Sequence, residues 1–329
     1  MRALTTSNQL PALVNNRTLF ERYLRIGDWL GWQLFCQYCK VIRLGGYERG
    51  VRILVIYEPG ELGQRLLERL NGTGLNITPL LLSRPEEVAL EQLQSWLEPH
   101  FDLVINVITL DDPETAETQP QQSRHRLYDL PVALAERAAI HAVAMLQLSS
   151  CYVFDGRKQQ PYISSNPGNP LATLGQCQWD CEQFLRSRLP RHLILRSGWS
   201  LRRLIDKVRN HPSEKPLAMS GRHFGQPVPV ADLVRVVAAI AQQLDCGAEA
   251  WGTYQYASAD PISMCDLGLE IAALMSREQR PHVVDEDAPW LALEPVNAIL
   301  NCRKIRHTFG IQQLPWCEAL RESEHVTES

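Results

Sequence analysis

The sequence of 329 residues lacks the long apolar segments that a membrane protein or a secreted protein needs. It has no run of about 18 uncharged apolar residues, so we expect no membrane-spanning helix. Glu21, Arg22 and Arg25 interrupt every early segment that could be the apolar part of a secretory signal peptide. The nine cysteines are odd in number and irregularly spaced, unlike a disulfide framework. The sequence therefore predicts a cytoplasmic protein with reduced thiols.

The sequence also lacks an excess of basic residues and a metal-binding pattern. Its 33 Lys and Arg residues are outnumbered by 37 Asp and Glu residues, which argues against nucleic-acid binding through a generally basic surface. Cys36 and Cys39 form a CxxC pair, but no second pair and no His pair lies at zinc-finger spacing from it. We therefore expect neither nucleic acid nor a metal ion as a ligand.

The first fifty residues differ in charge from the rest of the chain. They contain seven basic residues against Glu21, Asp28 and Glu48, whereas the whole chain has a net charge of −4. The aromatic-rich segment 19–44 is compatible with a helix that docks on a partner or a membrane surface, and the extension is also compatible with a mobile, disordered tail. The preferred hypothesis is that residues 1–50 precede the true start, because Val51 is compatible with a GTG start codon.

From residue 51 onward, short aliphatic segments alternate with longer amphipathic ones. Strands are predicted at 51–56, 76–82, 103–108, 144–148, 192–196 and 252–258, and helices at 62–70, 85–97, 130–141, 174–188 and 230–244. Strands that are apolar on both faces and separated by helices are typical of a parallel sheet covered on both sides. The predicted fold class is therefore α/β, with a doubly wound, Rossmann-like parallel sheet.

The pattern changes near residue 200, where prolines become frequent and the periodicity weakens. We predict a nucleotide-binding domain over 51–199 and a smaller, C-terminal cap of the substrate-binding type over 200–320. A helix and a strand within 230–258 are expected to return to the sheet, and 321–329 to form a tail. Because ligands of parallel sheets bind at the carboxyl ends of the strands, functional residues are expected near the ends of the first, third and fourth strands.

The turn after the first predicted strand contains part of a dinucleotide-binding motif. Its sequence is YEPGELG, over residues 57–63. Such a turn uses glycine where the backbone bends, where it meets the pyrophosphate, and where the helix packs on the strand. Gly60 and Gly63 fill two of these places, and Tyr57 stands at the other. Taken alone, this partial motif favours an ordinary turn between a strand and a helix.

A longer pattern begins at residue 148. Its segments are LSSCYVFDG (148–156), PY (161–162), PL (170–171), Gly175, Glu182, LRSGW (195–199), FGQP (224–227) and NAILN (297–301). In this order and at these spacings they resemble the dTDP-4-dehydrorhamnose reductases, which belong to the extended short-chain dehydrogenase/reductase superfamily. The resemblance covers residues 51–320 and supports the predicted fold.

The resemblance implies NADPH-dependent reduction of a 4-keto sugar nucleotide. In that chemistry a Tyr donates a proton to the carbonyl oxygen, a nearby Lys lowers the pKa of the Tyr, and a Ser or Thr binds the same oxygen. Ser149 and Ser150 match the Ser and Thr positions. The Tyr and Lys positions fall on Leu174 and Gln178, which can neither donate that proton nor carry that charge.

Other positions implied by the resemblance are partly kept. Cys151 replaces an acidic residue, an Asn is missing near Leu127, and Glu294 stands where an arginine is expected. NADP or NAD can still be expected to bind, more weakly because of Tyr57 and Gln178. The implied cofactor contacts are Gly60, Leu62, Gly63, Arg84, Asn106 and Gln178, and the implied substrate-type pocket consists of Ser150, Trp199, Phe224, Gln226 and Asn297.

Three functions stay open at this point. The favoured one is a homologue that has lost reductase chemistry and binds a nucleotide, a sugar nucleotide or a protein partner, similar to the regulatory subunit of methionine adenosyltransferase. The second is an active reductase with a relocated proton donor, Tyr162 or Cys177. The third is a scaffold that binds no cofactor, suggested by Tyr57 in the phosphate turn. Formation of a homo-oligomer is left open.

Overall fold

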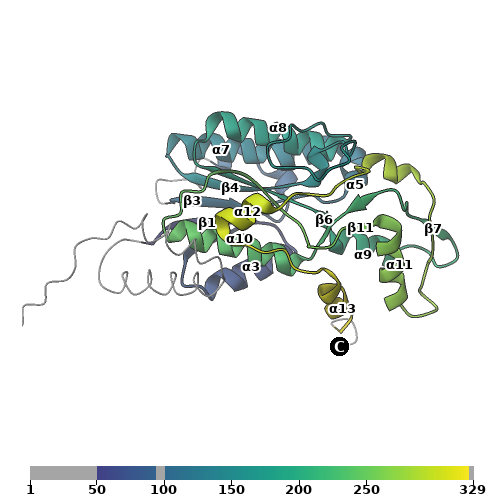
Figure 1. Cartoon of the computed structure of the whole chain (residues 1–329). Helices are drawn as coiled ribbons and strands as arrows, with labels where there is room; N and C mark the ends of the chain where they lie inside the picture. Colours follow the sequence, from purple (N-terminus) through teal and green to yellow (C-terminus); the bar gives the residue numbers. More distant parts are fainter. Residues whose placement is uncertain (1–49, 94–100, 326–329) are drawn as a thin grey trace, which may run out of the picture. The chain divides into compact units, whose positions relative to one another are not determined.

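The structure is a computed structural model that describes residues 50–93 and 101–325. Its main feature is a sheet of six parallel strands (Figure 1). The order of the strands is β10-β5-β4-β3-β1-β2. Their bounds are β1 Arg52–Tyr57, β2 Asn76–Leu81, β3 Leu103–Asn106, β4 Ala144–Ser150, β5 His192–Ser197 and β10 Gly252–Tyr256. The predicted α/β fold with a doubly wound parallel sheet is confirmed. The hypotheses on residues 1–49, including the Cys36 and Cys39 pair, lie outside the described residues.

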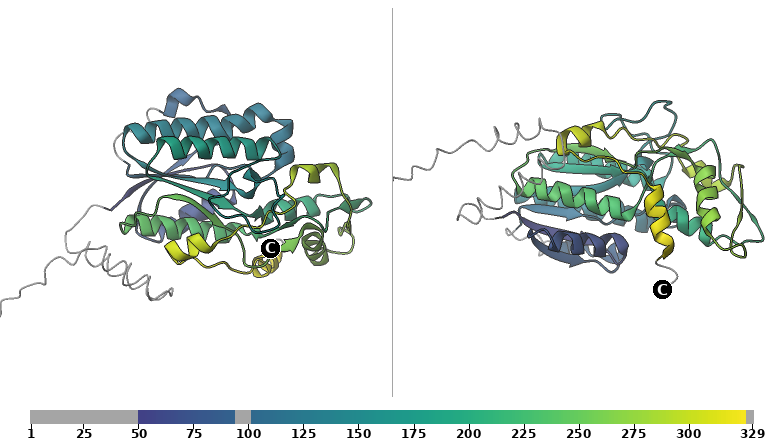
Figure 2. Two further views of the ribbon diagram at one scale, coloured as in Figure 1. Left: turned by 45° about the horizontal axis from the view of Figure 1, so that its top comes forward. Right: turned by 60° about the horizontal axis from the view of Figure 1, so that its bottom comes forward.

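Helices cover both faces of this sheet. The helices α3 (Glu61–Asn71) and α10 (Val230–Asp245) lie on one face, and α7 (Leu130–Ile140) and α8 (Thr173–Arg188) lie on the other (Figures 1 and 2). Alternate strand residues point to opposite faces, so each strand contributes to two apolar cores. In β1, for example, Ile53 and Val55 belong to the core beneath α3 and α10. Their neighbours Leu54 and Ile56 belong to the core beneath α7 and α8.

The register of the parallel strands brings three strand ends together. Ile56 of β1 pairs with Asn106 of β3, which in turn pairs with Gln147 of β4. Further along β4, Ser150 pairs with Ser197 of β5. The turn after β1 and the loops after β3 and β4 therefore meet at one edge of the sheet, where ligands of this architecture bind.

The chain beyond β5 adds helices and short strands at this edge. Small two-stranded sheets pair β6 (Trp199–Ser200) with β9 (Pro227–Val228), β7 (Pro216–Ala218) with β12 (His282–Val284), and β8 (Phe224–Gly225) with β11 (Ile262–Ser263). The helices beyond β5 are α9 (Leu201–Arg209), α11 (Met264–Leu274), η5 (Pro289–Leu293), α12 (Arg303–Phe309) and α13 (Cys317–His325). Of these, α12 lies at the other edge, where it packs on the start of β10 and the end of α10. Within 230–258, α10 packs on the main sheet beside α3, and β10 joins the sheet next to β5.

Several helices differ from the prediction. The part of 85–97 that is described contains only two short 3-10 helices, η1 (Pro85–Glu87) and η2 (Leu90–Gln92), because Val88 and Ala89 between them are extended. The helices α9 and α11 were not predicted, although Ser200 and Ser263 cap their first turns through their hydroxyl oxygens. The stretch before α7 was also not predicted to be helical and consists of α5 (Pro113–Thr118), α6 (Pro120–Arg124) and a π-helical turn, η3 (His125–Asp129). Within the described ranges, no helix is both long and apolar enough to span a membrane.

Candidate functional site

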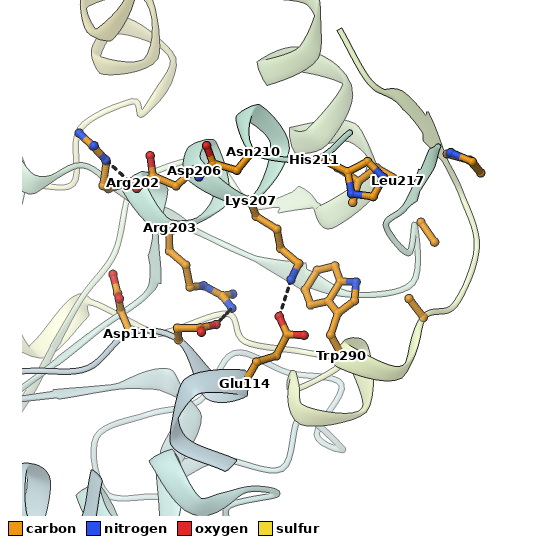
Figure 3. A pocket seen from close by; sticks show the side chains of 14 residues that line it. Asp111, Glu114, Arg202, Arg203, Asp206, Lys207, Asn210, His211, Leu217 and Trp290 are labelled. Carbon is orange, nitrogen blue, oxygen red and sulfur yellow. Dashed lines mark hydrogen bonds and ion pairs between the residues drawn. The ribbon is translucent and has the colours of Figure 1, made fainter. Parts of the chain in front are cut away.

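Two adjoining cavities lie where the strand ends meet. The turn cavity, of about 420 Å³, is lined by the turn after β1, the loops after β3 and β4, and the start of α9. The α9 cavity, of about 710 Å³, lies between α9, β7, η5 and the loop after β3 (Figure 3). Asp111 and Arg202 line both cavities, so a ligand longer than one cavity could extend into the other. Cavities of this size are typical of small-molecule sites.

The partial glycine motif forms one wall of the turn cavity. Gly60, Leu62 and Gly63 all line it, and Gly60 has a φ of 151°, a conformation that favours glycine. The ring of Tyr57 lies against Gly63, where a Cβ would collide with it. Tyr57 is not one of the residues that line the turn cavity. The tyrosine therefore occupies the space between strand and helix, and the backbone of the turn stays open to the cavity.

An ion pair that was not predicted from the sequence forms part of the wall of the turn cavity. Arg126 Nη2 donates to Glu58 Oε2, and Arg126 Nε donates to the carbonyl oxygen of Thr109 at 3.0 Å. Glu86 Oε2 lies 3.6 Å from Arg126 Nη1. Burial raises the pKa of Glu58, and the charge of Arg126 opposes that rise. A carboxylate thus lies within the turn in which a dinucleotide fold holds phosphate, and its position between Tyr57 and Gly60 was the only sequence signal for it.

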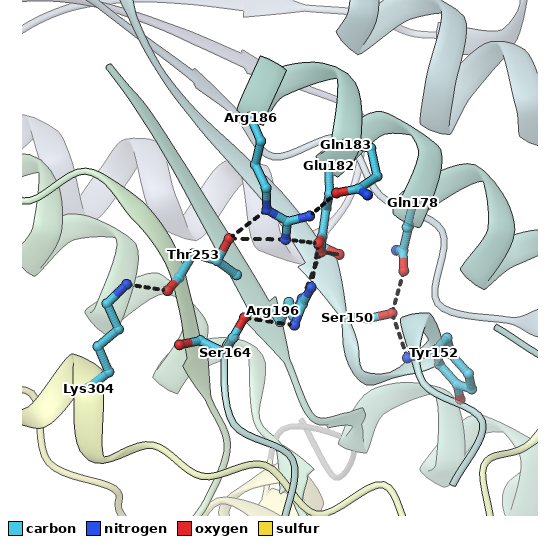
Figure 4. A network of polar contacts seen from close by, with 11 residues as sticks. Ser150, Tyr152, Ser164, Gln178, Glu182, Gln183, Arg186, Arg196, Thr253 and Lys304 are labelled. Atoms are coloured by element: carbon cyan, nitrogen blue, oxygen red, sulfur yellow. Dashed lines mark hydrogen bonds and ion pairs between the residues drawn. The ribbon is translucent and has the colours of Figure 1, made fainter. Parts of the chain in front are cut away.

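The two predicted serines line the turn cavity, but their hydroxyl protons are used inside the protein. Ser149 Oγ donates to Glu182 Oε1 at 2.7 Å. Ser150 Oγ donates to Gln178 Oε1 at 2.5 Å and accepts from the backbone N–H of Tyr152 at 3.3 Å (Figure 4). Either serine must release its partner on α8 before it can donate to a bound ligand.

The positions of the implied Tyr and Lys do not reach either cavity. Leu174 is completely buried in the apolar core, and Gln178 is 4% exposed. The Gln178 Nε2 amide is buried and has no hydrogen-bond partner within 50–93 and 101–325. This part of α8 packs closely on the loop after β4, because a Cβ on Gly175 would collide with the carbonyl oxygen of Tyr152. The helix is thus closely packed at these positions, and neither Leu174 nor Gln178 carries the implied acid or base group.

The two candidates for a relocated proton donor also lie away from the cavities. Tyr162 donates its hydroxyl proton to Asp155 Oδ1 at 2.8 Å, and its ring stacks on Phe154 with centroids 4.0 Å apart. Burial raises the pKa of the Cys177 thiol to about 11. Neither residue lines the turn cavity or the α9 cavity.

A buried ion pair fixes α8 to β5 beneath the serines. Arg196 Nε donates to Glu182 Oε1 at 2.8 Å, and Arg196 Nη2 donates to Glu182 Oε2 at 2.6 Å. Arg186 Nη2 also donates to Glu182 Oε2, at 2.5 Å, so the carboxylate is surrounded by donors (Figure 4). A bidentate pair of this kind is geometrically specific. It holds Ser149 in place and contacts neither cavity.

A second buried ion pair lies beside the α9 cavity. Arg203 Nη2 donates to Glu294 Oε1 at 2.7 Å, and the hydroxyl of Tyr152 donates to Glu294 Oε2 at 2.9 Å. Glu294 stands where the resemblance implies an arginine, and its partner comes from α9. Burial raises the pKa of Tyr152 well above its ordinary value, so its hydroxyl stays protonated. Arg203 was not identified from the sequence.

The other residues implied for the substrate-type pocket connect segments of the fold. Trp199 is completely buried, and its ring lies against Gly225, where a Cβ would collide with it. Gln226 Nε2 donates to the carbonyl oxygen of Ser258 at 2.8 Å, and Asn297 Nδ2 donates to that of Lys158 at 2.7 Å. Phe224, which is 44% exposed, forms backbone hydrogen bonds with Val296 and Ala298. Of this set, Ser150 is the residue that lines the turn cavity.

Two implied cofactor residues likewise lie outside the cavities. Asn106 is completely buried and donates to Gln147 Oε1 at 2.8 Å, which links β3 to β4. Arg84 is exposed and pairs with Glu87 at 2.7 Å. The described residues also contain no group of three or more His, Cys, Asp or Glu side chains placed to hold a metal ion.

Comparison with known proteins identifies, along most of the chain, the family that the sequence resembles. The family model "RmlD substrate binding domain" matches residues 51–327. A dTDP-4-dehydrorhamnose reductase from Aggregatibacter actinomycetemcomitans is 26% identical over 296 residues, which cover 84% of this chain and 99% of that protein. Methionine adenosyltransferase 2 subunit beta from Mus musculus is 25% identical over 251 residues, covering 71% of this chain and 72% of that protein.

Solved structures show the same fold. A dTDP-4-dehydrorhamnose reductase from Clostridium acetobutylicum superposes with a TM-score of 0.71 at 22% identity, covering 84% of this chain and 100% of that chain. One from Bacillus anthracis, solved in complex with NADP, gives a TM-score of 0.69 at 18% identity, with coverage of 85% and 100%. At these identities the likeness extends to the arrangement of helices and strands.

Proposed function

Because the chain belongs to the family of RmlD-like dTDP-4-dehydrorhamnose reductases, we propose that it is a member without reductase activity, which binds a nucleotide or sugar nucleotide in its cleft and acts through that binding. The proposal rests on Leu174 and Gln178, which stand where the resemblance implies the proton donor and its basic neighbour. Leu174 is fully buried, and Gln178 is hydrogen-bonded to Ser150. Neither side chain offers an acidic proton to a bound substrate.

The size of the expected loss supports this proposal. General acid catalysis contributes about 10²- to 10⁴-fold in rate, so its removal leaves a very slow reductase. A relocated donor is not favoured, because Tyr162 and Cys177 line neither cavity. Burial raises the pKa of Cys177 to about 11, which makes its thiol a weak acid and a poor proton donor near neutral pH. Tyr152 lines the turn cavity, but its proton is directed at Glu294.

The remaining cleft supports binding. The open backbone of the turn at Gly60 and the two adjoining cavities provide room for an extended ligand. Relatives give two precedents: one structure is a complex with NADP, and another relative is a subunit of methionine adenosyltransferase. We expect NADPH to bind weakly, because Gln178 brings no charge to the ribose and Glu58 brings a carboxylate to the phosphate turn. The weakening predicted from Tyr57 has no support in the geometry, because its ring packs against Gly63 outside the turn cavity.

The test is a pair of measurements on the full chain. NADPH oxidation with a dTDP-4-keto sugar is expected to be indistinguishable from the rate without protein, while calorimetry detects binding of dTDP or NADPH. Glu58→Gln is expected to raise NADPH affinity about tenfold, because it removes like charge from the phosphate turn. Turnover at an enzyme-like rate of about 1 s⁻¹ or more would contradict the proposal. Failure of the folded protein to bind any nucleotide would favour the scaffold instead.

A matched variant examines the cause of the loss. Leu174→Tyr with Gln178→Lys restores the two implied groups, and we expect measurable NADPH oxidation from it if the rest of the site is intact. Leu174→Phe with Gln178→Met is the control, since it introduces similar bulk without an acidic proton or a charge. Equal rates in the two double variants would show that these positions do not limit the reaction.

A further inference from the structure

We propose that Arg203 binds a phosphoryl oxyanion of the ligand in the α9 cavity, and that Glu294 holds its guanidinium in place from the opposite side. This inference rests on the proposed function, because it assumes that a phosphorylated ligand enters the cleft. It adds the residue that recognises the charged part of that ligand, in a position where the resemblance did not imply a basic residue.

The guanidinium of Arg203 has incomplete hydrogen bonding. Its side chain is 7% exposed and lines the α9 cavity. Nη2 donates to Glu294, whereas Nε and Nη1 are buried without a hydrogen-bond partner among the described residues. Asp112 Oδ1 lies 3.6 Å from Nη1, which is close enough for an ion pair but too long for a hydrogen bond.

Unsatisfied donors on a buried cation are rare in native proteins, and their cost is large. An oxyanion that accepts from Arg203 in the cavity would remove that cost. Asp112 can yield its place without losing its other contacts, because its Oδ2 accepts from the backbone N–H and the hydroxyl of Thr115 at 3.0 and 2.6 Å. The ligand would therefore compete only with the long contact to Oδ1.

Glu294 makes the guanidinium rigid before a ligand arrives. Its side chain is completely buried, and it accepts from Tyr152 as well as from Arg203. Although burial opposes ionisation, Glu294 holds the pKa of Arg203 above its ordinary value, so the group stays charged. A charged group that is already oriented loses little entropy when it binds.

The other cations of the wall have close partners within the protein. Arg202 Nε lies 2.8 Å from Asp206, and Lys207 Nζ lies 2.5 Å from Glu114. Figure 3 shows Arg203 and Lys207 extending from α9 toward Asp111, in the loop after β3, and Glu114, at the start of α5. Because acidic residues on this wall offset its cations, attraction for an anion is local to Arg203. We therefore expect binding with a weak dependence on salt.

The cavity also fits the remainder of a nucleotide. Trp290 forms part of the wall near Lys207, whose Nζ lies 4.1 Å from the ring centroid. An aromatic wall beside an anion-binding group suits a ligand with a planar base and a phosphate, and the volume of about 710 Å³ is sufficient for it.

The experiment measures binding of dTDP, thymidine and inorganic pyrophosphate to the full chain by calorimetry. Wild type is expected to bind dTDP at least tenfold more tightly than thymidine and to bind pyrophosphate detectably. In the double variant R203Q/E294Q both charges disappear together, so no unpaired charge stays buried. We expect it to bind dTDP at least tenfold more weakly than wild type, with the affinity for thymidine unchanged.

Two further variants separate recognition from structure. E294Q keeps the guanidinium but removes the charge that orients it, so we expect it to bind dTDP about threefold more weakly than wild type, a smaller loss than that of R203Q/E294Q. R222Q/D287N removes an exposed ion pair away from both cavities and serves as the matched double control, with affinities equal to wild type. Urea unfolding of each variant establishes that the folded state is being compared.

Three results would overturn the inference: equal dTDP affinity of wild type and R203Q/E294Q, equal weakening of dTDP and thymidine, or no dTDP binding at about 1 mM. A purely structural role of the ion pair predicts lower stability with unchanged dTDP affinity. Failure of the proposed function is visible separately, as NADPH oxidation by wild type, and leaves the comparison of these variants valid.

Discussion

The molecule contains two buried Glu–Arg pairs that differ in how completely they are satisfied. In the pair of Glu182 and Arg196, both carboxylate oxygens and all three guanidinium nitrogens have hydrogen-bond partners. In the pair of Glu294 and Arg203, two guanidinium nitrogens have no hydrogen-bond partner among the residues that the structure describes. The first pair lies between α8 and β5, away from both cavities, whereas Arg203 of the second pair lines the α9 cavity.

This difference separates stability from recognition. Glu182 and Arg196 are among the residues that carry the family resemblance. Their hydrogen bonds to each other connect α8 to β5, which is a structural role. Glu294 stands where the resemblance implies an arginine, and its partner Arg203, whose hydrogen bonding is incomplete, lines a cavity. A buried pair of charges is by itself weak evidence of stabilisation, so the hydrogen bonds around it decide its role.

The largest effect is expected from Glu182→Gln. It leaves Arg196 buried and charged with a neutral partner, and we expect the free energy of unfolding to fall by about 3–5 kcal/mol. Urea denaturation measures this loss. Glu114→Gln is the control, because Glu114 is 44% exposed and its pair with Lys207 should contribute about 0–1 kcal/mol. A loss below about 1 kcal/mol for Glu182→Gln would remove the distinction between the two pairs.

A smaller loss is expected from Glu294→Gln, about 2 kcal/mol in the same assay. The new amide oxygen can still accept from Arg203 or Tyr152, and Arg203 keeps Asp112 as an acidic neighbour at 3.6 Å. The cavity beside it also admits water to the charged group. A loss equal to that of Glu182→Gln would mean that both pairs are structural.

The contrast between the pairs also shows what the sequence can predict. The strands and the doubly wound sheet were predictable, because aliphatic segments and their alternation with helices are local properties. The positions of Ser149, Ser150 and Gly60 near the strand ends were also predictable, because each of them follows a predicted strand closely in the sequence. The partner of Glu294 was not predictable, because Arg203 lies 91 residues away in the chain. The same holds for Glu58 and Arg126, which are 68 residues apart.

A third prediction concerns the pH dependence of stability that arises from Asp112, the acidic neighbour of Arg203. Although burial opposes it, hydrogen bonds from Thr115 hold the pKa of Asp112 below its ordinary value. The folded pKa is therefore lower than the unfolded one, so the contribution is present above the unfolded pKa and is lost as pH falls through the folded pKa. We expect Asp112→Asn, which keeps a capping side chain, to cost about 1 kcal/mol at pH 7 and progressively less as pH falls below the ordinary pKa of an Asp. Denaturation across this range, repeated with Thr115→Val, measures the effect. A cost that stays constant with pH would assign it to the shape of the cap.

The smallest effect is expected from Ser149→Ala, about 0.5–1 kcal/mol. Ser149 donates to Glu182 Oε1, but that oxygen still accepts from Arg196 Nε at 2.8 Å after the hydroxyl is removed. If the Ser149 hydroxyl only supports the ion pair of Glu182 and Arg196, the dTDP and NADPH affinities of Ser149→Ala should equal those of wild type. Ser150→Ala is the matched comparison, because Ser150 lines the same cavity but contacts Gln178 instead of the ion pair. A loss of nucleotide affinity in Ser149→Ala with unchanged stability would place Ser149 in the binding site. The pair of Glu182 and Arg196 would then position Ser149 for the ligand, and the distinction between a structural pair and a ligand-binding pair would no longer hold.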